Sequence, residues 1–172
     1  SDLTAASDEL IQAAAGSHPL ASAAGFAALM LLGKSDAIAT VAAESNQSLT
    51  HSLEAVRLLE TAAARNLQRE RIIRALQGTD SPDVQRAALR ALATTTEDTP
   101  ASFAVVASLM QEPGLRPAAV RALSSLVSSD VDAALCDSIL QALVTKAESI
   151  SAESRTSDEF IDEMQLADAL LG

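Results

Sequence analysis

A short motif that recurs at nearly constant spacing constrains the fold of this 172-residue chain more than any other feature. The motif reads Ala, aliphatic, Arg, small or aliphatic, Leu, and it occurs at 55–59, 88–92 and 119–123. Its arginines, Arg57, Arg90 and Arg121, are 33 and 31 residues apart. A period of this size is typical of stacked repeats, in which each repeat is one supersecondary unit.

The composition indicates that the repeated units are helical. The chain contains 36 Ala and 24 Leu, which are both strong helix formers, but no Trp, no Tyr and only three Phe. Few segments alternate apolar and polar residues with the period of a strand. An all-α fold is therefore predicted, and a β-sandwich or β-barrel is not.

Apolar periodicity and capping signals divide the chain into helices and pair them. Ser81 and Thr99, each followed by Pro, mark the clearest helix starts, Gly16 is a candidate left-handed C-terminal cap, and Thr156 with Glu159 has capping-box spacing. Each copy of the arginine motif falls in the first helix of a two-helix unit, which predicts helical hairpins. The predicted helices are 3–15, 19–32, 36–43, 48–64, 67–77, 82–94, 100–111, 116–127, 130–147 and 156–171.

The paired units resemble HEAT repeats of the armadillo-like class over residues 19–147. The best copy is 80–92, where Asp83-Val84 precedes a helix that carries Arg90; the turn at 113–117 departs from this pattern. The resemblance implies an all-α, right-handed α–α superhelix, a HEAT-like solenoid of about four helical hairpins plus terminal helices. A single domain over 1–172 is then expected, with an N-terminal helix within 1–18, hairpins over 19–147 and a C-terminal capping helix at 156–171.

A further resemblance concerns the acidic C-terminal segment, 156–168. It is similar to the end of Ala-rich, HEAT-like segments in large bacterial haem-binding, cytochrome c-linked dehydrogenase chains. The resemblance implies an exported, periplasmic spacer between redox modules, with no haem or copper ligands in this fragment. Because the sequence begins without Met and ends directly after a helical pattern, we expect it to be excised from a longer protein.

The net charge of −11 and a pI near 4.4 exclude several classes of partner. An acidic chain repels a phosphate backbone on average, and without Trp or Tyr it has few platforms for stacked bases, so nucleic acid is not expected to bind. No apolar run is long enough to span a membrane. One cysteine can form neither an internal disulfide nor a CxxC motif.

Residues with catalytic or metal-binding chemistry are few and scattered. His18 and His51 form no HExxH or helical ExxH pair and are interpreted as surface or capping residues, and Cys136 as a small core residue. Carboxylates at 158, 159, 162 and 163 could attract a cation, although they more simply favour the N-terminus of a helix and solvate its surface. The prediction is therefore no enzymatic activity, no cofactor and no metal.

Arginines supply the candidate interaction surface. Residues 57–90 carry a net charge of +3, which fits an acidic partner or the chain's own acidic C-terminal helix. Arg69, Arg71 and Arg74 lie in a second helix, which usually lines the concave face of a solenoid, and are the binding candidates. Arg57, Arg90 and Arg121 are expected to form a structural ladder between successive hairpins.

The resulting functional hypothesis is a non-enzymatic domain for protein interaction, or a spacer, whose partner is a protein or a neighbouring domain of the same chain. A helical regulatory domain that binds a small ligand or metal is the alternative. The last helix is expected to close the array through an apolar stripe of Phe160, Ile161, Met164, Ala167, Leu170 and Leu171. The acidic side chains are expected on its other face, at Asp158, Glu159, Asp162, Glu163 and Asp168.

Overall fold

The structure is a computed structural model that describes residues 2–172, with side chains from residue 6 onward. Every regular element in this range is helical and no strand occurs in it, which confirms the predicted all-α class. The chain divides into two compact units, residues 1–95 and 96–172. The expectations of a single domain and of a superhelical solenoid stay predictions.

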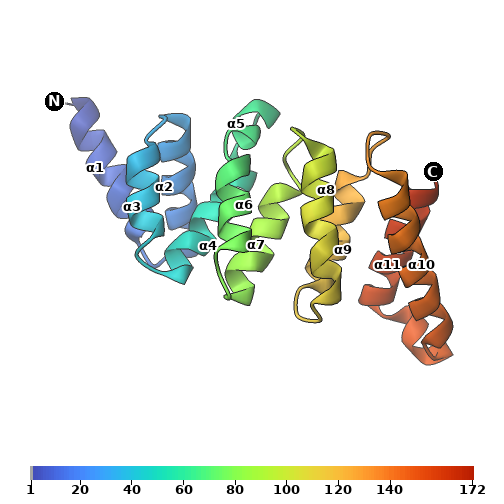
Figure 1. The fold of residues 1–172 in the computed structure, drawn as a ribbon. Coiled ribbons are helices and arrows are strands. Elements are labelled where there is room, and N and C mark those ends of the chain that lie inside the picture. The colour runs from blue at the N-terminus through green and yellow to red at the C-terminus, as the bar shows by residue number, and fades with distance from the viewer. Residues whose placement is uncertain (1) are drawn as a thin grey trace. The chain divides into compact units, whose positions relative to one another are not determined.

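Residues 1–95 form a layered bundle of short helices (Figure 1). Helices α2, α4 and α7 pack side by side in sequence order. Helix α1 packs against α2, α3 packs against α4, and α6 packs against α7. The elements are α1 (Asp2–Ala15), α2 (Pro19–Leu31), α3 (Ser35–Ala42), α4 (Asn46–Glu54), the 3₁₀ turn η1 (Ala55–Leu58), α5 (Ala62–Asn66), α6 (Arg69–Gln77) and α7 (Pro82–Leu92).

The core of residues 1–95 follows from helical periodicity. In α7, Val84, Ala87, Ala88 and Ala91 recur at steps of one, three and four residues and are all fully buried. Alanine at most of these positions lets the neighbouring helices approach closely, and larger side chains fill the remaining space. The largest of these fully buried side chains are Phe26, Leu29, Leu53, Ile72, Leu89 and Leu92.

The prediction of one continuous helix over 48–64 is wrong for its second half. Helix α4 ends at Glu54, the chain leaves η1 in extended conformation at Leu59, and a separate helix, α5, begins at Ala62. The Arg65 guanidinium donates hydrogen bonds to the carbonyl oxygens of Leu59 at 2.6 Å, Glu60 at 3.2 Å and Thr94 at 2.9 Å. The contacts with Leu59 and Glu60 satisfy backbone groups freed by the break, and the contact with Thr94 joins this segment to the chain just beyond the end of α7. A pattern of local periodicity does not reveal these contacts.

Two of the predicted helix caps differ from the caps in the structure. Ser81 is the N-cap of α7 as expected, but the last helix is capped by Ser157, whose Oγ accepts a hydrogen bond from the Phe160 N–H at 3.3 Å, and not by Thr156. The left-handed glycine is Gly33, with φ of 66°, and not Gly16. Gly33 lets the chain turn sharply between α2 and α3.

Residues 96–172 form a second helical bundle. Helix α9 packs against α8, and α11 packs against both α9 and α10. Leu123, Leu126, Leu143 and Leu166 are buried within this unit. The elements are α8 (Thr99–Ser108), η2 (Leu109–Gln111), α9 (Arg116–Leu126), α10 (Ala133–Ser149), η3 (Ala152–Thr156) and α11 (Asp158–Leu171).

Gly25 marks the closest approach of α1 and α2 and yields a stability prediction. A Cβ atom at this position would lie 2.7 Å from the backbone N of Ala14 and 3.0 Å from the backbone O of Leu10, and backbone atoms cannot move aside as a side chain can. Gly25→Ala is expected to lower the free energy of unfolding by about 1–3 kcal/mol, as overpacking does elsewhere. Gly114→Ala is the control, because a Cβ there meets nothing within 4 Å. Urea denaturation followed by circular dichroism measures both, and equal stability of the two variants would contradict the close α1–α2 contact.

Candidate interaction groove

Residues 1–95 contain a concave groove with a volume of about 740 Å³. One side is formed by α3 and the other by α6, while Leu49 of α4 and Met30 of α2 contribute from the helices between them. We call this feature the α3–α6 groove. Its lining residues are Met30, Gly33, Ser35, Asp36, Ile38, Ala39, Ala42, Ala43, Leu49, Leu67, Gln68, Glu70, Arg71, Arg74, Ala75, Gly78 and Thr79.

Apolar side chains make up much of the groove's lining. Met30 and Ile38 are buried, Leu49 is half-buried, and Leu67 at the edge has 83% of its surface exposed. A leucine this exposed gains no stabilisation from folding, but it would gain from being covered by another molecule. Concave apolar surface with an exposed leucine at its edge is typical of a binding site.

Helix α6 directs two arginines at the groove. Arg71, Arg74 and Ala75 line it, because residues three and four apart share one face of a helix, while Ile72 and Leu76 are buried. Of the three arginines predicted as an interaction surface, the structure thus brings Arg71 and Arg74 to the groove. Arg69 is not among the lining residues and has interactions of its own.

Arg71 is held in place by neutral groups. Its Nη1 donates a hydrogen bond to Ser52 Oγ at 3.1 Å, and its Nη2 donates to the Ser52 carbonyl oxygen at 3.3 Å and contacts Met30 Sδ at 3.8 Å. Its Nε is buried and has no hydrogen-bond partner. The guanidinium is therefore fixed in orientation while part of its donor capacity stays unused.

The charge of Arg71 is not neutralised by the described part of the chain. Asp36 and Glu70 also line the groove, but no carboxylate among the described residues forms an ion pair with Arg71 or Arg74. Burial, with a smaller contribution from the Arg74 charge, lowers the pKa of Arg71 to about 10. The fold thus disfavours the charged form of Arg71, and an anion in the groove would relieve this penalty.

A second, smaller cleft of about 370 Å³ lies between the first turns of α4 and α7. Its lining is polar and includes Arg86 and Arg90. Arg86 Nη2 pairs with Asp83 Oδ1 at 2.7 Å, and Arg90 Nε donates to Glu54 Oε1 at 2.8 Å. Because the arginines in this cleft already have carboxylate partners, the α3–α6 groove is the stronger candidate for a binding site.

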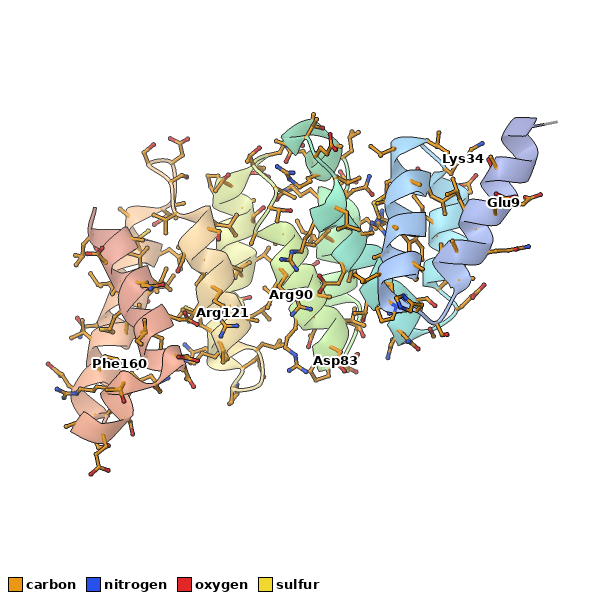
Figure 2. The ribbon with its side chains drawn as sticks, turned by 180° about the vertical axis from the view of Figure 1, so that it is seen from behind. Glu9, Lys34, Asp83, Arg90, Arg121 and Phe160 are labelled. Carbon is orange, nitrogen blue, oxygen red and sulfur yellow. The ribbon has the colours of Figure 1, made fainter. Side chains whose placement is uncertain are left out.

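The three motif arginines each pair with a carboxylate. Arg90, which projects from α7 (Figure 2), and Arg57, at the end of η1, both bind Glu54, Arg57 through Nη1 at 3.1 Å. In residues 96–172, Arg121 of α9 donates from Nε to Asp162 Oδ2 of α11 at 2.7 Å. Arg90 and Arg121 therefore each link two packed helices, whereas Arg57 pairs with the residue one turn before it.

The two histidines have structural roles. His18 caps α2, with Nδ1 accepting a hydrogen bond from the Ala21 N–H at 3.4 Å, in agreement with the capping interpretation. His51 is buried rather than on the surface, and its Nδ1 lies 3.0 Å from Ser22 Oγ. Since the Ser22 hydroxyl donates its only proton to the Ala14 carbonyl oxygen at 2.6 Å, His51 Nδ1 must be the donor to Ser22.

Cys136 lies on α10 and is half-buried. Partial burial and the nearby Asp137 and Asp132 charges raise the pKa of its thiol. A raised pKa lowers the fraction of thiolate, so the surroundings of Cys136 do not activate it as a nucleophile.

An ion cluster attaches α11 to the rest of residues 96–172. Glu163, which is 1% exposed, accepts hydrogen bonds from Arg116 Nε at 2.7 Å and Lys146 Nζ at 2.8 Å. Lys146 Nζ also donates to Glu159 Oε1 at 2.7 Å. Burial tends to lower the pKa of Lys146, but the hydrogen bonds to Glu159 and Glu163 outweigh it and raise the pKa above its ordinary value.

The predicted faces of α11 are therefore partly wrong. Glu163 was expected on the solvent side and is buried, while Ile161 and Leu171 were expected in the apolar stripe and are exposed. Leu166, which the stripe omitted, is fully buried. The physical reason is that Arg116 and Lys146 meet Glu163 from the helices beneath, which turns α11 so that 163 and 166 face inward.

Among the described residues, no three His, Cys, Asp or Glu side chains gather in a way that would hold a metal ion. No helix in the described part of the chain combines the length and apolar character needed to cross a membrane.

Comparison with known proteins gives no match to a family model, to a curated protein sequence or to a solved structure. The resemblances to HEAT repeats and to dehydrogenase-linked segments therefore stay predictions from the sequence.

Proposed function

We propose that this chain is a non-enzymatic protein-interaction domain of the HEAT-like class, and that its α3–α6 groove receives a helical segment of a partner protein. The observation that carries the proposal is the groove itself, which lies between α3 and α6, has a volume of about 740 Å³ and is lined in large part by apolar side chains. An amphipathic helix that inserts its apolar face into such a groove is a common mode of peptide recognition.

The exposed leucine at the groove's edge also supports this proposal. Leu67 lines the groove and has 83% of its surface exposed. Burying one such leucine contributes roughly 1.5–3 kcal/mol. A partner helix that covers Leu67 and part of the groove floor would therefore gain enough apolar contact to bind with useful affinity.

A matched pair of leucine variants tests the proposal. Displayed 16-residue helical peptides are selected on the full chain, and each selected peptide is then measured by fluorescence anisotropy. Leu67→Asn, in the groove, is expected to weaken binding roughly tenfold or more, as the loss of a buried leucine does. Leu20→Asn is the control, because Leu20 is 75% exposed but does not line the groove.

Both leucines are so exposed that neither variant should unfold the protein, and unchanged melting temperatures verify this. Failure to select any peptide, or selected peptides that bind Leu67→Asn as tightly as Leu20→Asn, would contradict the proposed docking site.

The suggested position between redox modules of an exported dehydrogenase concerns the parent chain. We keep it as a proposal that the flanking sequence tests: a CxxCH haem-attachment motif downstream would support it.

A further inference from the structure

Resting on the proposed function, we propose that the partner helix is acidic: one of its carboxylates binds the Arg71 guanidinium while its apolar face covers the groove between α3 and α6. The proposal specifies both parts of the ligand's chemistry, a carboxylate for Arg71 and apolar side chains for Met30, Ile38, Leu49 and Leu67.

The uncompensated positive charge of Arg71 indicates that the ligand of the groove is anionic. Arg71 is a largely buried cation whose guanidinium contacts a hydroxyl, a carbonyl oxygen and a thioether, all of them neutral. Its Nε is an unused buried donor. A buried cation without a counter-ion destabilises a fold. The position of Arg71 beside the groove is explained if an anion of another molecule binds there as its counter-ion.

Neighbouring charges agree with a carboxylate partner. Arg74, one turn along α6, is exposed on the same face and adds a second positive charge. Its Nε donates a long hydrogen bond, 3.4 Å, to the Glu70 carbonyl oxygen. Asp36 on α3 and Glu70 on α6 are exposed at the groove. Asp36 would repel a partner whose acidic residues faced α3. The acidic side of the partner is therefore expected to face α6, where Arg71 and Arg74 outnumber Glu70.

The same recognition chemistry already operates inside residues 96–172. Helix α11 is acidic and amphipathic, and it is bound through Glu163, which contacts Arg116 and Lys146, and through the buried Leu166 (Figure 2 labels Phe160 at its N-terminal end). Arg71 and Arg74 offer a comparable pair of cations beside an apolar groove, but no carboxylate among the described side chains of residues 6–95 forms an ion pair with them.

The probe is a fluorescein-labelled peptide of residues 157–171, because that sequence is an acidic amphipathic helix that binds this kind of surface. We expect it to bind the full chain at least tenfold more tightly than the same peptide with every Asp and Glu changed to Asn or Gln. Arg71→Met should remove this preference and weaken binding of the acidic peptide roughly ten- to hundredfold, as the loss of a hydrogen bond to a charged group does. Arg57→Gln is the control, because Arg57 lies outside the groove.

Stability measurements separate a binding role of Arg71 from a structural one. Methionine replaces the apolar stem of the arginine with an unbranched apolar side chain and removes a buried, uncompensated charge. Arg71→Met is therefore expected to melt at the same temperature as the wild type or higher. A clear drop in melting temperature would show that Arg71 is needed for the fold and would contradict a role kept for a ligand. Arg74→Gln provides a second variant, since Arg74 is exposed, and it should weaken the acidic peptide's binding several-fold without changing stability.

The outcomes distinguish this inference from the proposed function. If helical peptides bind in a way that depends on Leu67 but acidic and neutral peptides bind equally, the acidic inference is wrong and the groove still functions as a docking site. If no peptide binds, both are wrong. If the peptide only displaces the chain's own α11, it binds outside the groove and the acidic inference is contradicted. If the chain forms dimers that Leu67→Asn dissociates, the occupant is a second copy of this protein and the inference of a separate partner is contradicted.

Discussion

Deleting residues 155–172 should lower the melting temperature by many degrees and cause the remaining chain to self-associate. The deletion removes α11, which packs on both α9 and α10. Leu166 is fully buried, and its loss alone costs roughly 1.5–3 kcal/mol. Phe160, Met164 and Leu170 are half-buried and add to this cost.

Self-association follows from the surface that the deletion uncovers. The faces of α9 and α10 under α11 would become exposed, and Arg116, Arg121 and Lys146 would lose their carboxylate partners. Exposed apolar faces on adjacent helices promote association between copies. Light scattering coupled to size-exclusion chromatography and circular dichroism melting measure the two effects.

Deletion of residues 171–172 is the matched control, because Leu171 is mostly exposed and should contribute little. If the chain without 155–172 stays monomeric and melts as the full chain does, α11 does not act as a cap for residues 96–172 and its role as a linker is favoured instead.

Glu163→Gln should cost about 3 kcal/mol of unfolding free energy, at the lower end of what breaking a buried ion pair costs, because Arg116 and Lys146 retain some access to water. The substitution preserves the volume of the side chain, so the effect reports the charge and not a cavity. Urea denaturation followed by circular dichroism is the appropriate measurement, since the chain has no Trp or Tyr to provide fluorescence.

Glu159→Gln is the control for Glu163→Gln. Both carboxylates accept a hydrogen bond from Lys146, but Glu159 is 48% exposed and Glu163 is 1% exposed. The Glu159 variant should lose less than about 1 kcal/mol, as exposed ion pairs do. Equal losses in the two variants would show that burial does not determine the contribution of this cluster.

The raised pKa of Lys146 adds a pH dependence. Stabilisation from a cation whose pKa is higher in the folded state is complete below its unfolded value of 10.5 and is lost as the pH rises through the folded value. The stability difference between wild type and Glu163→Gln should therefore be constant near neutral pH and shrink in strongly alkaline buffer.

The sequence was sufficient to predict the all-α class and most of the helices, because Ala and Leu faces and Pro-marked starts act within one helix. It also selected Arg69, Arg71 and Arg74 of a second helix as binding candidates, and two of these, Arg71 and Arg74, line the groove. Contacts between helices could not be predicted from the sequence. Arg65 donates a hydrogen bond to Thr94, 29 residues away in the chain, and Arg116 donates one to Glu163, 47 residues away. These contacts ended the helix predicted at 48–64 and turned α11 away from its predicted orientation.

The groove could be predicted only in part for the same reason. Local periodicity assigns Arg71 and Arg74 to one face, but the neutral partners of Arg71 come from Met30 on α2 and Ser52 on α4. Whether an arginine is compensated depends on every helix packed around it, and that cannot be read from its own helix.

Methyl NMR on the three methionines tests the groove most directly, because they divide cleanly between the two parts of the chain. Met30 lines the α3–α6 groove and contacts Arg71, whereas Met110 and Met164 lie in residues 96–172. Titration of the ¹³C-methyl-methionine-labelled chain with the unlabelled 157–171 peptide should shift the Met30 signal and leave the other two unchanged. A shift at Met110 or Met164 with Met30 unmoved, or no shift at any of the three, would contradict the docking site in the groove.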